Sequence, residues 1–63
     1  MNTKLKLRRI EINKKQKDVA KDVGISQQYL SNLENGITNN PSLEIMKKLS
    51  EVLNTTVQDL FFN

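Results

Sequence analysis

The sequence predicts an all-α fold in which five short helices surround one small core. Glycine and proline together supply only three of the 63 residues, so little interrupts helix formation. Apolar residues recur at helical spacing, and residues that favour helix starts and stops separate these segments. A chain of this length is expected to form a single domain, residues 1–63, near the lower size limit for folding without disulfides or metals.

The first helix is expected from Thr3 to Ile12. Leu5 and Ile12 fall on one face of this helix, and Arg9 lies between them. An unpaired buried charge is costly, so an arginine inside an apolar stripe requires a carboxylate partner. The polar run Asn13-Lys14-Lys15 ends the pattern.

The second helix is expected from Gln16 to Val23. Gly24 ends it, because glycine adopts the left-handed conformation without steric penalty. Lys15 is a poor N-cap, and serine or asparagine there would make the helix about 1 kcal/mol more stable. The side chains expected in the core are Val19, Ala20 and Val23.

The third helix is expected to begin at Gln27, with Ser26 as its N-cap, and to end at Asn35-Gly36. Ile25 precedes the cap and is expected to pack against Leu30. At about 100° per residue, Leu30 and Leu33 point toward the core. The opposite face presents a strip of hydrogen-bonding side chains, here called the amide strip: Gln27, Gln28, Ser31 and Asn32.

The last two helices follow the loop Ile37 to Pro41. Pro41 is expected to let the fourth helix start, and that helix covers Ser42 to Leu53. Asn54 serves as the left-handed residue after it, and Thr56 caps the short fifth helix. The apolar residues of the two helices are Leu43, Ile45, Met46, Leu49, Val52, Leu53, Val57, Leu60, Phe61 and Phe62.

Charge is distributed unevenly along the chain. Residues 1–21 contain eight Lys or Arg and two acidic residues, a balance of +6, whereas residues 22–63 contain two lysines and five acidic residues, a balance of −3. A basic N-terminal third suits a polyanionic partner. A solvated lysine-rich face is the alternative interpretation of the same pattern.

Composition also excludes several classes of function. The chain has no cysteine and no histidine, so we expect no disulfide, no metal site, no cofactor and no enzymatic activity. No apolar run approaches the about 20 residues of a membrane span. The basic N-terminus lacks the apolar segment of a signal peptide. We therefore expect a cytoplasmic protein that does not contact membranes.

Two helices of about eight residues separated by Gly-Ile-Ser predict a helix-turn-helix. Because this turn is too short for antiparallel packing, the second helix is presented outward. An α-helix fits the major groove of B-DNA, and glutamine or asparagine can form two hydrogen bonds to adenine. The amide strip is therefore expected to read bases.

Four stretches together resemble the lambda-repressor-like helix-turn-helix regulators of phages and bacteria, the xenobiotic-response-element type. They are LKLRRIEIN, QKDVAKDVGISQQYLSNLENG, NPSLEIMKKLSEVLN and TTVQDLF, and they cover nearly the whole chain. The resemblance implies a compact five-helix DNA-binding domain. It also implies that Arg9 pairs with Glu34, a buried ion pair between the first and third helices.

The resemblance further assigns roles at a DNA interface. Base contacts are implied for Gln27, Gln28, Ser31 and Asn32. Contacts to the DNA backbone are expected from Gln16, Lys15, Lys17, Tyr29, Asn35, Thr38 and Asn40. Lys14-Lys15 departs from the family pattern, in which an apolar residue and a capping residue precede the second helix. These lysines are expected to add phosphate contacts and to weaken the cap.

We expect a sequence-specific regulator of transcription, a repressor that binds a two-fold symmetric operator in double-stranded DNA as a homodimer. The dimer interface is expected at the C-terminal end, at Val57, Gln58, Phe61 and Phe62. In the competing interpretation Phe61 fills the core and Phe62 only frays. The alternative function is an antitoxin or anti-regulator whose main partner is a protein bound at the surface of the last two helices. No small-molecule effector is expected, because the chain has no room for a sensor domain.

Overall fold

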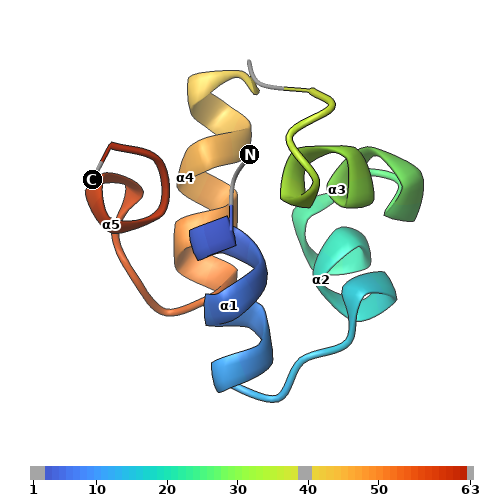
Figure 1. The fold of residues 1–63 in the computed structure, drawn as a ribbon, viewed down its shortest axis with the longest axis horizontal. Helices are drawn as coiled ribbons and strands as arrows, with labels where there is room; N and C mark the ends of the chain where they lie inside the picture. The colour runs from blue at the N-terminus through green and yellow to red at the C-terminus, as the bar shows by residue number, and fades with distance from the viewer. Residues whose placement is uncertain (1–2, 39–40, 63) are drawn as a thin grey trace.

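The computed structural model describes residues 3–38 and 41–62, and within them the chain forms five α-helices and no strand (Figure 1). The helices are α1 (Thr3–Glu11), α2 (Gln16–Val23), α3 (Gln27–Glu34), α4 (Leu43–Val52) and α5 (Val57–Phe61). α1 and α4 lie in the middle of the view, with α2 and α3 on one side and α5 on the other. The predicted all-α class and the number of helices are confirmed in the part described.

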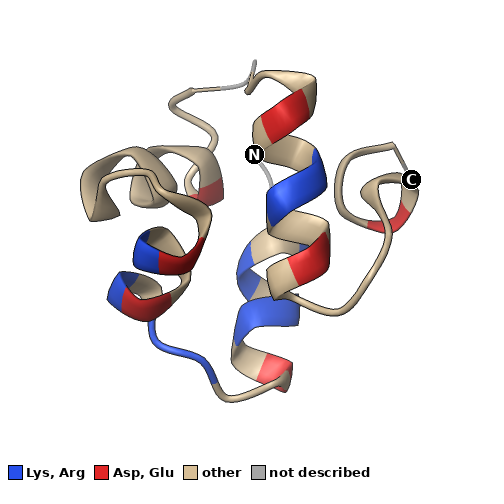
Figure 2. Cartoon of the chain, turned by 180° about the vertical axis from the view of Figure 1, so that it is seen from behind, with Lys and Arg blue, Asp and Glu red and all other residues tan. Residues whose placement is uncertain are grey.

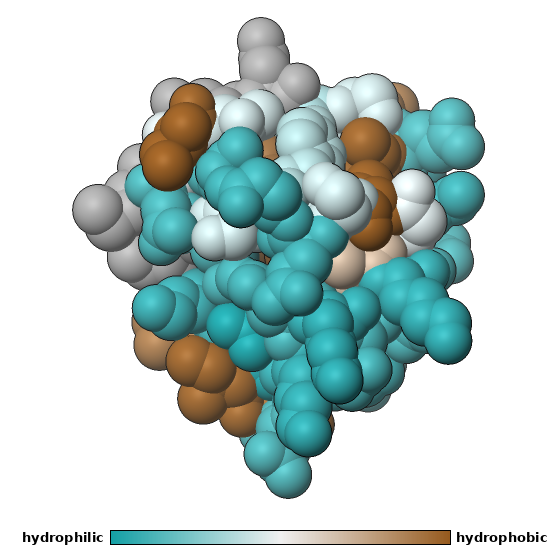
Figure 3. All heavy atoms as spheres, turned by 90° about the vertical axis from the view of Figure 1, so that its right-hand side faces the viewer, coloured by the Kyte–Doolittle hydropathy of each residue, from teal (hydrophilic) through white to brown (hydrophobic). Residues whose placement is uncertain are grey.

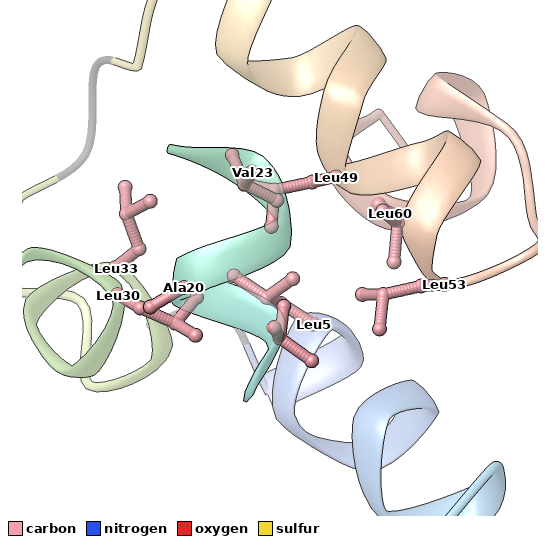
Figure 4. Close-up of a cluster of buried hydrophobic side chains, with 9 residues drawn as sticks. Leu5, Ala20, Val23, Leu30, Leu33, Leu49, Leu53 and Leu60 are labelled. Atoms are coloured by element: carbon pink, nitrogen blue, oxygen red, sulfur yellow. The ribbon is translucent and has the colours of Figure 1, made fainter. Parts of the chain in front are cut away.

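All five helices contribute side chains to one core (Figure 4). Its buried members are Leu5, Val19, Ala20, Val23, Leu30, Leu33, Leu49, Leu53 and Leu60. The expected core residues of α2 and α3 are therefore confirmed. Of the other apolar residues, Leu43 is 57% exposed at the start of α4, and Ile12 is half-buried just beyond the end of α1, where it packs against the core.

Hydroxyl side chains cap three of the helix starts. Ser26 Oγ accepts a hydrogen bond from the Tyr29 amide at 3.0 Å, and Thr56 Oγ1 accepts one from the Asp59 amide at 3.0 Å. Ser42 Oγ accepts one from the Ile45 amide at 3.2 Å, so Ser42 is the N-cap of α4 rather than its first residue. Pro41 precedes the cap, and the helix starts one residue later than the Ser42 that was expected.

By contrast, α2 begins without a capping side chain. Lys15 occupies the N-cap position with extended backbone angles and makes no side-chain cap hydrogen bond. A lysine ammonium is a donor and cannot accept the amide hydrogens of the first turn. The predicted weakness of this cap is confirmed.

Four helices end on a residue with positive φ. These residues are Asn13 (+60°), Gly24 (+88°), Gly36 (+75°) and Asn54 (+53°). In each case the next amide bonds back to a carbonyl five residues earlier, the pattern that closes a helix end. Stops were expected at all four places, although the left-handed conformation of Asn13 was not, and α1 ends at Glu11 rather than Ile12.

Arg8 joins α1 to the C-terminal end of α4. Its Nε and Nη2 donate to the carbonyl oxygens of Leu53 and Asn54, each at 2.8 Å, and its Nη1 lies 3.5 Å from Glu11 Oε1. A guanidinium at this position satisfies carbonyls that the helix leaves unpaired and opposes the negative end of its dipole. The contact with Leu53 spans 45 residues of sequence and was not predicted.

Candidate nucleic-acid interface

The amide strip lies on the outer face of α3. Gln27 and Gln28 are exposed, and Ser31 and Asn32 are half-buried at its edge. Leu30 and Leu33, on the inner face, are buried in the core. Figure 3 shows that the side of the molecule formed by α2 and α3 is mainly hydrophilic, with isolated apolar patches. The strip is therefore open to a partner.

A buried ion pair fixes the inner end of this site. Arg9 Nε donates to Glu34 Oε2 at 2.7 Å, and Arg9 Nη2 donates to Glu34 Oε1 at 3.1 Å. The side chains are only 13% and 2% exposed, so little water screens the pair. Arg9 Nη1 also donates to the Lys14 carbonyl at 3.0 Å, which holds the turn before α2. The structure thus brings together the two residues that the sequence paired and adds a third contact.

Gln16 extends this network to the amide strip. Its Nε2 donates to Glu34 Oε1 at 3.2 Å, and its Oε1 accepts a hydrogen bond from Gln27 Nε2 at 3.2 Å. Side-chain hydrogen bonds therefore run without a break from Arg9 to Gln27. Sequence reasoning placed these residues at one interface but did not predict the bonds between them.

The other members of the strip are also hydrogen-bonded. Gln28 Nε2 donates to Asn32 Oδ1 at 3.0 Å, one helical turn further along. Asn35 Nδ2 donates to Ser31 Oγ at 3.3 Å. Both pairs are four residues apart, a spacing that places side chains on one face of a helix. This spacing could have predicted both hydrogen bonds from the sequence.

The residues expected at the DNA backbone lie at both ends of the strip. Lys15 and Lys17 are exposed around the start of α2, and the basic segment before α2 is visible in Figure 2. Asn35 is exposed after α3, and Thr38 is half-buried. Tyr29 is half-buried and packs against the core, which leaves part of its ring exposed at the margin. Asn40 lies outside the described residues.

The residues expected at a dimer interface behave differently from one another. Phe61 is half-buried and packs against the core, whereas Phe62 is 61% exposed. Val57 is half-buried and Gln58 is exposed on α5. α5 and α3 lie on opposite sides of α1 and α4 in Figure 1.

A cleft of about 330 Å³ lies between α1 and α5. Its lining includes Leu7 and Arg8 from α1 and Asp59 and Leu60 from α5. Leu7 is 59% exposed. Phe62, just after α5, is another large apolar side chain that is exposed.

The part of the chain that the structure describes shows neither a metal-binding cluster nor a membrane-spanning helix. It contains no group of three or more acidic, histidine or cysteine side chains placed to hold a metal ion. None of its helices has the length and apolar character needed to cross a bilayer.

A short helix with an exposed amide face, positioned by a second short helix across a tight turn, defines a helix-turn-helix DNA-binding domain. The chain belongs to the helix-turn-helix family of transcriptional regulators: the family model described as "Helix-turn-helix" matches residues 5–60. The class inferred from the sequence is confirmed.

Relatives and solved structures agree with this assignment. An uncharacterized HTH-type transcriptional regulator of Archaeoglobus fulgidus is 36% identical over 61 residues, covering 97% of this chain and 84% of the relative. SinR of Bacillus subtilis, an HTH-type transcriptional regulator, is 35% identical over 43 residues, covering 68% of this chain and 39% of SinR.

Two solved SinR structures share the fold. SinR in complex with DNA superposes with a TM-score of 0.88 and 30% identity, over 95% of this chain and 98% of that one. A SinR/SinI protein complex gives a TM-score of 0.90 and 29% identity, over 98% of this chain and 60% of that one.

Proposed function

We propose that this chain is a transcriptional repressor that binds a two-fold symmetric operator as a homodimer and reads bases in the major groove with the amide strip of α3. The observation that carries the proposal is the network from Arg9 to Gln27, because it fixes an exposed amide on a helix that the core holds in place. SinR, solved with DNA, has the same fold. Repression follows if the bound dimer blocks access to a promoter.

Each part of the interface has a distinct chemical task. An amide carries a donor and an acceptor in one plane, which matches the N6 and N7 atoms of adenine. Lys15 and Lys17 supply positive charge to phosphates next to the start of α2. We assign Gln16 a phosphate contact at the start of α2, beside Gln27, to which its amide is hydrogen-bonded. We assign the remaining backbone contacts to Tyr29, Asn35, Thr38 and Asn40.

Binding-site selection from random duplexes, followed by affinity measurements, tests the base reading. Gln27→Ala should weaken binding to the selected site by about 1–3 kcal/mol and leave binding to random DNA almost unchanged. Lys17→Ala should weaken both equally and reduce the salt dependence by about one charge. Equal loss on selected and random DNA with Gln27→Ala would rule out base reading by this residue.

The homodimer is proposed to form through Val57, Gln58, Phe61 and Phe62. Phe62 is 61% exposed just after α5, and a large exposed aromatic side chain favours association. Phe62→Ala should weaken dimerisation in sedimentation experiments with no loss of thermal stability. Leu43→Ala, which truncates a side chain of similar exposure on α4, is the matched control and should leave the dimer intact. If Phe62→Ala left the dimerisation constant unchanged, the proposed interface would be ruled out.

The same surface supports a second candidate, an antitoxin or anti-regulator module that binds another protein. SinR, which has this fold, is solved with SinI protein, and Leu7 and Phe62 are the exposed apolar groups available here. Loss of a protein partner with retained operator binding in Phe62→Ala would favour this candidate. Under either function we propose a cytoplasmic, single-domain protein without enzymatic activity, cofactor or small-molecule effector.

A further inference from the structure

We infer that Asn32 is a positioning residue for Gln28: its side-chain oxygen fixes the orientation of the Gln28 amide, so that Gln28 selects adenine instead of adapting to other bases. The inference rests on the proposed base reading by α3. It assigns Asn32 an effect on the base opposite Gln28, in addition to any base that Asn32 itself contacts.

The contact that carries this inference is the hydrogen bond from Gln28 Nε2 to Asn32 Oδ1, 3.0 Å long. Gln28 is exposed, so the protein offers its amide few other constraints, whereas Asn32 is half-buried. The Asn32 carbonyl accepts hydrogen bonds from the amides of Ile37 and Thr38, at 2.9 and 3.2 Å. The backbone at Asn32 is therefore fixed by the closed end of α3, and its short side chain presents Oδ1 to Gln28.

The orientation of an amide decides which bases it accepts. The last torsion of a glutamine side chain is broad and roughly two-fold, so a free amide exchanges its oxygen and nitrogen positions easily. A rotating amide can donate to the acceptors of guanine or thymine, accept from cytosine, or pair with adenine. Such an amide supplies affinity with little discrimination.

The bond to Asn32 removes this freedom. Only the nitrogen of the Gln28 amide can donate to Asn32 Oδ1, so while Asn32 presents this oxygen the Gln28 amide cannot turn over without losing a hydrogen bond. One hydrogen on Nε2 and the oxygen Oε1 remain for a base. A donor and an acceptor in fixed order match N7 and N6 of adenine. Gln27 is oriented in the same way by Gln16, so both exposed amides are held before DNA arrives.

Base preference at a single operator position tests the inference. Selection with the full chain defines the operator, and loss of one preference with Gln28→Ala identifies the base pair that Gln28 contacts. Affinities are then measured for the four possible base pairs at that position. For the wild type we expect adenine to be preferred by about 5-fold to 100-fold.

Asn32→Ala should reduce the adenine preference at the Gln28 position at least three-fold, because the amide can turn over. Asn32→Asp should keep the preference, since a carboxylate oxygen also accepts from Nε2, although its charge lowers affinity for all four duplexes alike. Lys48→Ala, on the exposed side of α4, is the unaffected control. Thermal unfolding establishes that each variant is folded.

A preference in Asn32→Ala equal to that of the wild type would overturn the inference and leave base reading by Gln28 intact. A loss in Asn32→Asp as large as in Asn32→Ala would also overturn it, because the acceptor is retained in the aspartate. If Gln28→Ala itself changes no base preference, the proposed base reading by Gln28 fails and the inference fails with it.

Discussion

Replacing Glu34 by leucine would leave the Arg9 guanidinium without its carboxylate between α1 and α3. Arg9 and Glu34 are 13% and 2% exposed, so water cannot readily take the place of the lost partner. Removing one member of such a buried pair costs about 3–5 kcal/mol. At roughly 0.05–0.15 kcal/mol per residue, the total stability of a 63-residue domain is about 3–9 kcal/mol. Glu34→Leu should therefore lose at least about a third of the stability.

The double variant Arg9→Met, Glu34→Leu separates the charge effect from simple packing. It removes both charges and fills the space with apolar groups, so it should recover most of the stability lost by Glu34→Leu alone. Urea unfolding measures the difference. With a slope of about 1–3 kcal/mol per molar urea, the midpoint of the single variant should fall by at least about 1 M.

Two results would refute this reasoning. One is a single variant within about 1 kcal/mol of the wild type, and the other is a double variant less stable than Glu34→Leu. DNA binding gives a second readout, because Glu34 also accepts the hydrogen bond from Gln16. In the folded double variant, Gln16 loses its hydrogen bond to Glu34 and keeps only the one from Gln27. Because the Gln27 amide is then held less firmly, binding to the specific site should weaken more than binding to random DNA.

Three further substitutions test separate features of the chain. Lys15→Ser should supply the missing cap of α2 and raise stability by about 1 kcal/mol, while reducing the salt dependence of DNA binding; an unchanged melting temperature would argue against a capping defect. Gly24→Ala should lower the free energy of unfolding, measured by heat or urea, by about 1 kcal/mol, because the φ of +88° is unfavourable for alanine. The added Cβ meets no neighbour within 4 Å, so the cost comes from the backbone alone. An unchanged stability would mean that the turn relaxes. Arg8→Met should cost about 1–2 kcal/mol through its two lost hydrogen bonds to the end of α4, with DNA affinity little changed. A normal urea midpoint for Arg8→Met would show that water replaces the guanidinium there.

Local chemistry made most of the fold predictable. Gly24 and Asn54 were expected to end helices, and Ser26 and Thr56 to begin them, and the structure has all four in these roles. Each of these helix boundaries depends on interactions among residues within about five positions of one another. The one-residue error at the start of α4 was also local: Ser42 was expected inside the helix, whereas its hydroxyl forms the cap. Leu43 was expected among the apolar residues of α4, yet it lies in the first turn of the helix and is 57% exposed.

Contacts between distant segments were harder to predict. The pairing of Arg9 with Glu34 was accessible, because a charge in an apolar stripe demands a partner and the family resemblance indicated which one. The residue before it, Arg8, could not be assigned a partner from the sequence, because it lies among several lysines and resembles another exposed cation. The hydrogen bond between Gln16 and Gln27 depends on how α2 and α3 cross, which periodicity does not determine.

The helix ends with positive φ also bear on how quickly the chain folds. Each stop is encoded by one residue, and three of the four connections between helices span only three or four residues. Few conformations need to be searched before neighbouring helices meet, since the entropy of closing such short loops is small. Proteins dominated by contacts of this range fold in microseconds to milliseconds. The Arg8 bridge to the end of α4, which joins residues 45 positions apart, should form late, so that its loss accelerates unfolding more than it slows folding.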